Sequence, residues 1–308
     1  MLGSIYALIA LGYTMVYGIL RIINFAHGDI LMVGALTTLS ASNALNTTFP
    51  HMPQLLQLGV ALMIAMAVCA LLAMAVERFA YRRLRNAPRL APLISGIGVS
   101  VLLQTVAMII WTRNPLMFPQ ILPMDPIAVT SGSEAHPPAI VTVTGIVTGI
   151  VTVVLALAVM TGLWLLVEYT RLGRGMRAVA ENPRVATLMG VNPNAIITLT
   201  FAIGGAFAAL AGVMMASNYG NASFSMGFLP GIKAFTAAVL GGIGNIRGAM
   251  IGGILLGIIE ALGAGYLGEL THGVFGSNYQ DVFAFMVLIL VLVFRPAGLL
   301  GERVANRA

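Results

Sequence analysis

The sequence predicts an all-α fold, a polytopic transmembrane helical bundle of about eight or nine spans. Composition is the first reason, because 59% of the residues are hydrophobic and only 8% are charged, whereas soluble domains carry about 25% charged residues. The second reason is the recurrence of apolar stretches close to the roughly 20 residues that a spanning helix needs. We expect residues 1–308 to form a single transmembrane domain.

Nine apolar stretches follow one another along the chain, separated by shorter polar, glycine-containing or proline-containing segments. They cover residues 2–20, 30–45, 55–76, 93–111, 140–167, 196–217, 232–243, 249–267 and 282–294. The stretch 232–243 is short for a hydrocarbon layer about 30 Å thick. A segment that enters and leaves on the same side would lower the count by two crossings.

The arginines orient these spans, because short loops rich in Lys and Arg stay on the cytoplasmic side. Basic residues concentrate in segments 77–92, 168–195 and 295–308, which we predict to be two cytoplasmic loops and a cytoplasmic tail. Segments 43–54 and 112–139 must then face outward, and Arg113 is their only Lys or Arg. This parity places the N-terminus outside and the C-terminus inside.

Several classes of protein and site are disfavoured. The net charge of +6 does not indicate nucleic-acid binding, because the sixteen basic residues are spread between hydrophobic spans. Cys69, the only cysteine, lies in an apolar stretch and is predicted to be a packed core thiol. The chain has no G-x-x-x-x-G-K-[ST], H-E-x-x-H or G-x-S-x-G motif, so we expect no catalytic residue, metal site or bound cofactor in it.

Two charged residues fall within predicted membrane segments, where an unpaired charge is costly. Glu260 lies about thirteen residues beyond Arg247, or roughly 20 Å of helix. A row of small residues at four-residue spacing runs beside it and predicts close helix packing: Gly253, Gly257, Ala261 and Gly265. Glu260 should therefore face protein, either as a pathway or gating contact or as a structural hydrogen-bond partner. Lys233, the only lysine, either snorkels to the interface or supplies a cation near the path.

Segments 24–29 and 241–245 interrupt the apolar pattern with polar residues or glycines. Each is either a helix break at membrane depth, which requires surrounding protein or a wet cavity, or a plain cytoplasmic turn. With the charged residues above, they supply the candidate positions on a translocation path or gate. These candidates are Asn24, His27, Gly28, Lys233, Gly241, Gly242, Gly244 and Glu260.

Segment 168–195 carries the pattern of a short helix outside the membrane. Asn182 followed by Pro183 is typical of an N-cap and first helical position, and Gly190 followed by Pro193 of a helix end. We therefore predict a helix over 183–189. It would expose Val185, Leu188 and Met189 to a groove on a partner protein. The alternative is a loop that only joins two spans.

Four stretches carry a family resemblance: LIALGYTMVYG (8–18), INFAHG (23–28), KAFTAAVLGGIG (233–244) and GAMIGG (248–253). They closely resemble the LivH-type permeases of high-affinity branched-chain amino-acid ABC transporters, and the similarity runs over about residues 2–300. The resemblance implies a heteromeric importer in the bacterial cytoplasmic membrane. A periplasmic binding protein would deliver Leu, Ile or Val to this chain and a homologous second permease.

The same resemblance implies that two cytoplasmic ATPases bind the ATP and magnesium and drive the cycle, while this chain contacts membrane lipid and no nucleic acid. The segment that resembles the family's ATPase-contacting loop contains Arg174, Gly175, Arg177, Ala178, Glu181, Ala186 and Gly190. Three alternatives remain: an importer of urea or short-chain amides, an ion-coupled secondary transporter, and an intramembrane enzyme, against which the missing motifs count.

Overall fold

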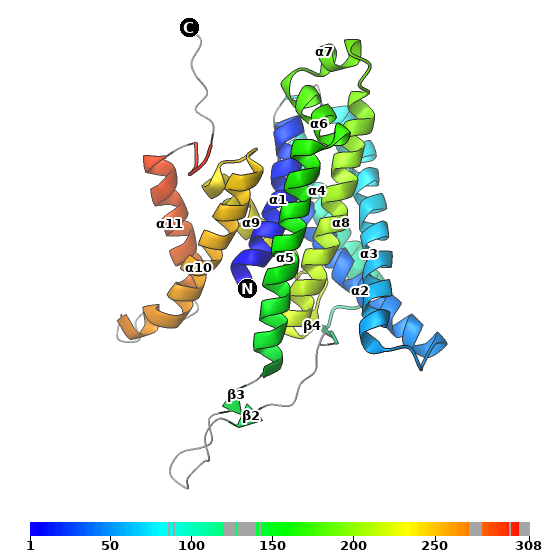
Figure 1. Cartoon of the computed structure of the whole chain (residues 1–308), viewed down its shortest axis with the longest axis vertical. Coiled ribbons are helices and arrows are strands. Elements are labelled where there is room, and N and C mark those ends of the chain that lie inside the picture. The colour runs from blue at the N-terminus through cyan, green and yellow to red at the C-terminus, as the bar shows by residue number, and fades with distance from the viewer. Residues whose placement is uncertain are drawn as a thin grey trace.

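The computed structural model describes residues 1–85, 87–88, 90–119, 127–128, 140–141, 143–270, 279–295 and 297–301. Within these residues the chain is almost wholly helical, as predicted (Figure 1). The long helices are α1 (Leu2–Leu20), α2 (His27–Thr48), α3 (Gln54–Val76), α4 (Leu90–Ile110), α5 (Val143–Tyr169), α8 (Pro193–Tyr219), α9 (Phe228–Gly241), α10 (Ile246–Leu270) and α11 (Gln280–Phe294).

Shorter elements connect these helices. They are the π-helical turn η1 (Glu77–Tyr81), the 3-10 turn η2 (Arg82–Leu84), α6 (Arg171–Glu181) and α7 (Pro183–Leu188). Among the described residues, β1 (Leu116–Met117) pairs antiparallel with β4 (Asn221–Ala222), and β2 (Ile127–Ala128) pairs antiparallel with β3 (Ile140–Val141).

Six helices of the described residues are long and apolar enough to cross a membrane: α1, α3, α4, α5, α8 and α10. Helix α2 has 22 residues but is less apolar than α1. Helices α9 and α11 have 14 and 15 residues, and at 1.5 Å per residue α9 cannot cross a layer of about 30 Å. Each of the nine predicted apolar stretches forms a helix, and the chain is a multi-pass membrane protein.

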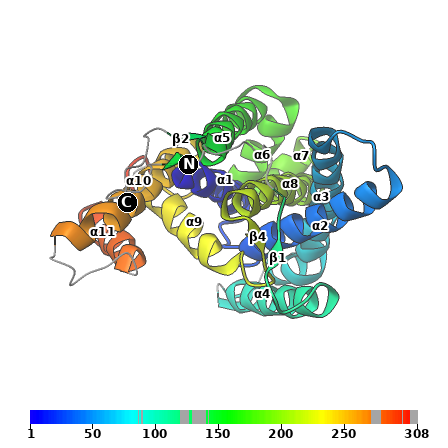
Figure 2. The same cartoon turned by 90° about the horizontal axis from the view of Figure 1, so that it is seen from below.

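Helices α1 and α8 form the centre of the bundle, whereas α3, α4 and α5 enclose it (Figure 2). In the apolar windows of α1 and α8, 78% and 67% of the residues are buried, against 28%, 22% and 22% in α3, α4 and α5. Helices that are apolar on all sides and exposed over most of their surface are suited to contact lipid.

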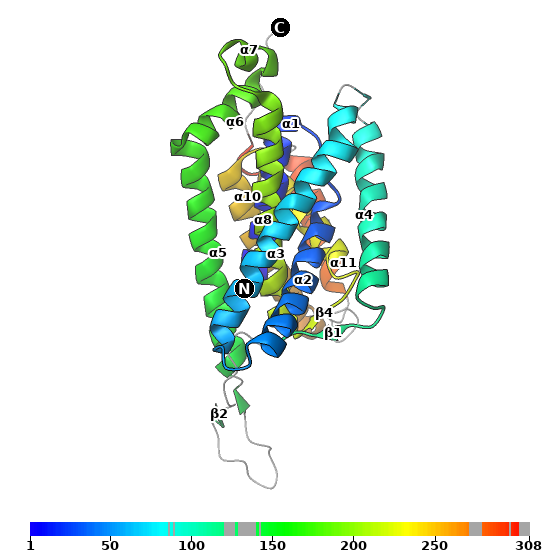
Figure 3. The same ribbon diagram turned by 90° about the vertical axis from the view of Figure 1, so that its right-hand side faces the viewer.

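The described parts of the three arginine-rich segments lie at one end of the bundle. The turn between α3 and α4, the α6–α7 region and the C-terminal end of α11 are at this end, and β1 and β4 are at the other (Figures 1 and 3). This arrangement has the geometry that the predicted parity requires. Residues 302–308 of the predicted tail, and residues 120–126 and 129–139 of the predicted outer loop, lie outside the described residues.

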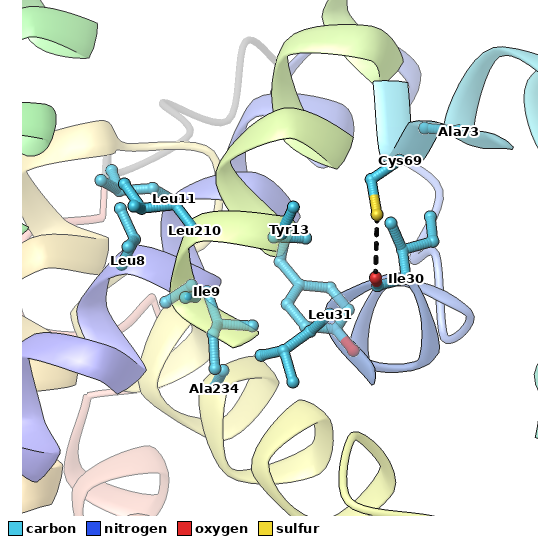
Figure 4. Close-up of a cluster of buried hydrophobic side chains, with 14 of the residues drawn as sticks. Leu8, Ile9, Leu11, Tyr13, Ile30, Leu31, Cys69, Ala73, Leu210 and Ala234 are labelled. Atoms are coloured by element: carbon cyan, nitrogen blue, oxygen red, sulfur yellow. Dashed lines mark hydrogen bonds between the residues drawn. The ribbon is translucent and has the colours of Figure 1, made fainter. Parts of the chain in front are cut away.

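A tightly packed apolar core joins α1, α2, α3, α8 and α9 (Figure 4). Cys69 of α3 is fully buried in it, and its Sγ donates a hydrogen bond of 3.4 Å to the carbonyl oxygen of Ile30 in α2. The prediction that this residue is a packed core thiol is therefore confirmed.

The row of small residues on α10 packs closely along its first half only. A Cβ added at Gly253 would overlap Ala7, and one added at Gly257 would overlap Gly3, so the backbones of α10 and α1 touch. The prediction is wrong for the second half, where Ala261 is exposed and Gly265 has no neighbour within 4 Å of an added Cβ. The reason is that α1 begins level with Gly257, and α10 extends beyond it.

Candidate functional site

Helix α2 begins inside the bundle rather than at its end. Helix α1 stops at Leu20, Arg21 adopts a left-handed conformation (φ 53°), and His27 then lies against Gly12, whose added Cβ would overlap the imidazole ring. Gly12 is roughly 12 Å below the end of α1 at 1.5 Å per residue. Asn24 and His27 are each 2% exposed. Segment 24–29 is therefore a helix break at membrane depth, not a plain turn.

Helix α9 begins at the same depth. Because β4 lies at the opposite end of the bundle from α7 (Figure 1), the chain runs back into the bundle before Gly227, the N-cap of α9. A Cβ added at Gly28 would overlap the carbonyl oxygen of Gly227 and lie 3.0 Å from the Cα of Gly231. Only residues without a side chain allow this approach. We call the contact of Gly28, Gly227 and Gly231 the central crossing.

Aromatic side chains surround the central crossing. The Tyr13 ring meets the His27 ring edge-on, with centroids 5.0 Å apart, and lies 6.1 Å from the Phe235 ring. The Phe25 ring lies 5.7 Å from Phe235. Tilted and edge-on ring pairs of this kind are favourable packing arrangements. Since the rings come from α1, α2, α9 and the segment between α1 and α2, a solute crossing the bundle here would have to displace them.

A buried ion cluster joins α9, α10 and α11. Lys233 Nζ lies 2.7 Å from Glu260 Oε1 and 2.6 Å from Asp281 Oδ1, and the Tyr6 hydroxyl of α1 donates to Glu260 Oε1 at 3.2 Å. Lys233 is 9% and Glu260 2% exposed. Glu260 therefore faces protein, as predicted. The interpretation of Lys233 as a residue that snorkels to the interface is wrong, because its ammonium is held between two carboxylates.

The glycine-rich segment 241–245 is the turn between α9 and α10, so here the plain-turn interpretation holds. Gly242 and Gly244 have φ of +107° and +96°. The turn is covered by the end of the described chain, where the backbone N–H groups of Leu299 and Leu300 donate to the carbonyls of Leu240 and Gly241, each at 2.9 Å.

The predicted short helix is present as α7 and ends one residue earlier than predicted. Asn182 caps it, since its side-chain oxygen accepts from the backbone N–H groups of Arg184 and Val185 at 3.0 and 3.2 Å. Gly190 follows with φ +81°. Pro193 starts α8. The structure thus has a helix where the alternative expected only a connecting loop.

Helix α6, which the sequence did not predict, precedes α7 and buries Gly173, Gly175, Met176 and Val179. On its exposed side lie four of the predicted coupling residues, at helical spacing that gives them one face: Arg174, Arg177, Ala178 and Glu181. Of the other three, Gly175 packs on Ile196, Ala186 is buried in α7 and Gly190 ends α7. A hollow of about 150 Å³ lies among α1, α5, α6 and the α9–α10 turn, with Arg177 and Gly244 among its lining residues.

Comparison with known proteins identifies the family. The family model described as "Branched-chain amino acid transport system / permease component" matches residues 1–292. The chain belongs to this family of permease components. It is therefore a transport subunit of a multi-subunit system rather than an enzyme.

Individual relatives extend over nearly the whole permease. It is 45% identical to the high-affinity branched-chain amino acid transport system permease protein BraD of Pseudomonas aeruginosa, over 97% of this chain and 92% of the relative. It is 42% identical to LivH of Escherichia coli, over 98% of this chain and 92% of the relative. The galactose/methyl galactoside import permease protein MglC of Escherichia coli is 31% identical, but over only 37% of this chain and 35% of the length of MglC. No solved structure matches the permease.

Two members of the ion cluster were missed from the sequence. Asp281 directly precedes the predicted stretch 282–294, and an acidic residue at the edge of an apolar helix was an available signal. Tyr6 lies within an apolar stretch, where an aromatic side chain does not stand out. Nothing local connects either residue with Lys233 of this permease, because the pairing depends on how α1, α9, α10 and α11 pack.

The turn at Gly242 gives a first testable prediction. Replacing Gly242 by alanine should destabilise the permease by about 1–3 kcal/mol, because a side chain is strained at positive φ. The added Cβ would also lie 2.7 Å from the Cα of Gly301. Thermal unfolding of the purified protein in detergent would measure the change. Gly98→Ala is the matched control, since Gly98 is helical and has open space around it. It should lose less stability than Gly242→Ala, and equal losses in the two variants would contradict the prediction.

Proposed function

We propose that this permease moves branched-chain amino acids across the bacterial cytoplasmic membrane by alternating access, as one subunit of a heteromeric importer. The near full-length identity of 42–45% to permeases named for branched-chain amino acids supports this cargo. The proposed partners are a homologous second permease, a periplasmic binding protein and two cytoplasmic ATPases. The ATPases bind the ATP and magnesium, and this chain needs no cofactor of its own.

The ATPases dock on a surface formed by α6 and α7, which we call the coupling surface. Its polar half is the exposed face of α6, with Arg174, Arg177, Ala178 and Glu181. Its apolar half is α7 with its C-cap Met189, where Val185, Leu188 and Met189 are 51%, 85% and 78% exposed. Exposed apolar side chains at the end of the bundle, on helices outside the membrane spans, favour a protein partner.

The path runs through the central crossing, and α9 carries its movable parts. Helix α9 contributes Gly231 to the crossing, Lys233 to the ion cluster, and Gly241 to the turn beside the hollow that Arg177 lines. Displacement of that turn by the coupling surface would therefore move all three together. In this proposal Asn24, His27 and Gly28 line or gate the path from the α2 side, and Lys233, Glu260, Gly241, Gly242 and Gly244 do so from the α9–α10 side.

Reconstitution tests the proposal. The importer, assembled from this permease and its partner subunits in proteoliposomes, should take up leucine only when ATP is hydrolysed on the ATPase side. Uptake driven by an ion gradient alone would instead indicate a secondary transporter. Titration of the purified cognate binding protein with leucine and then urea separates the two importer cargoes, and saturation by urea alone would contradict the proposed cargo.

Two substitutions on the coupling surface test its role. Arg177→Ala and Glu181→Ala should each abolish uptake while leaving membrane insertion intact. Arg177 donates to the carbonyls of Val167 and Glu168 at the end of α5, so its loss would remove side-chain bonds that hold α6 against α5, whereas Glu181 is exposed next to α7. Leucine uptake and the amount of permease in the membrane fraction are the two measurements. Unchanged uptake in both variants would contradict the coupling role.

A further inference from the structure

The π-helical turn η1 is placed between the coupling surface and the central crossing. Single π-helical turns are rare and are frequently found at functional sites. The first and last residues of η1, Glu77 and Tyr81, are both fully buried. Each uses a polar group to reach a different part of the bundle, although both belong to a segment that the sequence marks as a cytoplasmic loop.

Glu77 connects η1 to the start of α8. Its carboxylate pairs with Arg82, at 2.7 Å, and with Arg85, and it accepts a hydrogen bond of 2.9 Å from the Thr198 hydroxyl. Arg82 also donates to Thr198 at 2.7 Å, and Arg85 donates to Asn194 at 2.6 Å. Asn194 and Thr198 lie in the first turns of α8, directly after α7. A displacement of α7 that moves the start of α8 must therefore take this cluster with it or break the bonds from Thr198 to Glu77 and from Arg85 to Asn194, although Glu77 would keep its pairs with Arg82 and Arg85.

Tyr81 connects η1 to the helix break before α2. Its hydroxyl donates to Asn24 Oδ1 at 3.0 Å, and its ring lies 5.7 Å from that of Phe201 in α8. On the α4 side, a Cβ added at Gly96 would lie 2.5 Å from the hydroxyl. Tyr81 is thus confined by α4 and α8 and bonded to the segment that leads into His27 and the central crossing.

We propose that η1 transmits displacement of α7 and of the start of α8 to the break before α2, with Glu77 and Tyr81 as its two positioning residues. This inference rests on the proposed function and adds a route to it. The turn can act as one body because its two buried polar ends are only four residues apart, whereas the elements they hold lie far apart in the sequence. The alternative is a passive clamp, which would affect the stability of the bundle without affecting how tightly ATP hydrolysis is linked to uptake.

The test measures leucine transported per ATP hydrolysed by the complete importer in proteoliposomes. Tyr81→Phe keeps the ring and removes the hydroxyl, and Glu77→Gln removes the charge. Each should lower the ratio by about threefold or more. Because both act on one route, the double variant should lose little more than the worse single variant. Tyr266→Phe is the matched control, since Tyr266 is 58% exposed, and it should keep the wild-type ratio.

Gly96→Ala provides a separate route to the same hydroxyl. Its added methyl group would push the Tyr81 side chain away from Asn24, so this variant should also lower the ratio. If Glu77→Gln fails to assemble, Gly96→Ala and Tyr81→Phe together test the inference.

Wild-type ratios for Tyr81→Phe and Gly96→Ala, in preparations where the wild type shows ATP-driven uptake, would overturn the inference and leave the proposed function intact. A reduced yield of folded importer with an unchanged ratio would favour the passive clamp and overturn it equally. Absence of ATP-driven leucine uptake by the wild type would instead contradict the proposed function.

Discussion

Replacing Lys233 by methionine should lower the free energy of unfolding of the permease by about 3–5 kcal/mol, the range seen when one partner of a buried ion pair is removed. The methionine side chain is similar in length, so the change removes the charge and leaves little space unfilled. Glu260, 2% exposed, would then have the hydroxyl of Tyr6 as its only partner in the part of the chain that the structure describes. The helix bundle would then have to bury an unpaired carboxylate or open around it.

Unfolding of the purified permease in mixed micelles, with an increasing fraction of a denaturing detergent, would measure this loss of stability. Two further variants separate charge from packing. Asp281→Asn should cost less than Lys233→Met, because the Asp281 side chain is 36% exposed and Lys233 would keep Glu260 as its ion-pair partner. Lys233→Met combined with Glu260→Gln should recover much of the stability, since the carboxylate at 260, which is the more deeply buried of the two, is then no longer left charged and unpaired. A double variant as unstable as Lys233→Met alone would contradict this account of the cluster.

The sequence was sufficient for those features that depend on local pattern. Each predicted apolar stretch is a helix, because length and hydropathy decide which segments lipid can accept. The cap at Asn182 and the end at Gly190 locate α7 within one residue, since capping is a property of a few adjacent residues. The burial of Glu260 followed from the high cost of placing a charge in lipid.

Features that depend on packing between distant segments could not be predicted in this way. The central crossing requires Gly28 to meet Gly227, and no local pattern records that contact. Glu77 is the clearest case, because an acidic residue among arginines after an apolar stretch is typical of a solvated loop. The fold instead buries it completely between Arg82, Arg85 and the start of α8.

The location of the charged groups also bears on how the permease treats its cargo. Lys233, Glu260 and Asp281 neutralise one another in part, and aromatic and small residues form the central crossing. A zwitterion with an apolar side chain would meet no unpaired cation there among the described residues. The permease would therefore discriminate less between cargoes than a binding protein with dedicated partners for the ammonium and carboxylate groups, and selectivity in the proposed importer would come mainly from that subunit.

Leu188→Asp should reduce ATP-driven leucine uptake by at least about 30-fold, the effect of losing an interface contact worth roughly 2 kcal/mol or more. Leu188 is 85% exposed on α7, so the substitution removes no packing within the permease, and its own stability should change by less than about 0.5 kcal/mol. In the proposed importer, the aspartate would instead place a charge in the ATPase groove that receives α7.

Leu188→Met is the matched control, because it keeps an apolar side chain of similar size and should retain most of the uptake. Co-purification of the ATPases with each variant distinguishes loss of docking from loss of a later step. We expect the ATPases to be lost from Leu188→Asp and retained by Leu188→Met. If Leu188→Asp kept both its ATPases and its uptake, α7 would not be the site where the ATPases dock. The proposed transmission through the start of α8 would then lack the displacement of α7 on which it depends.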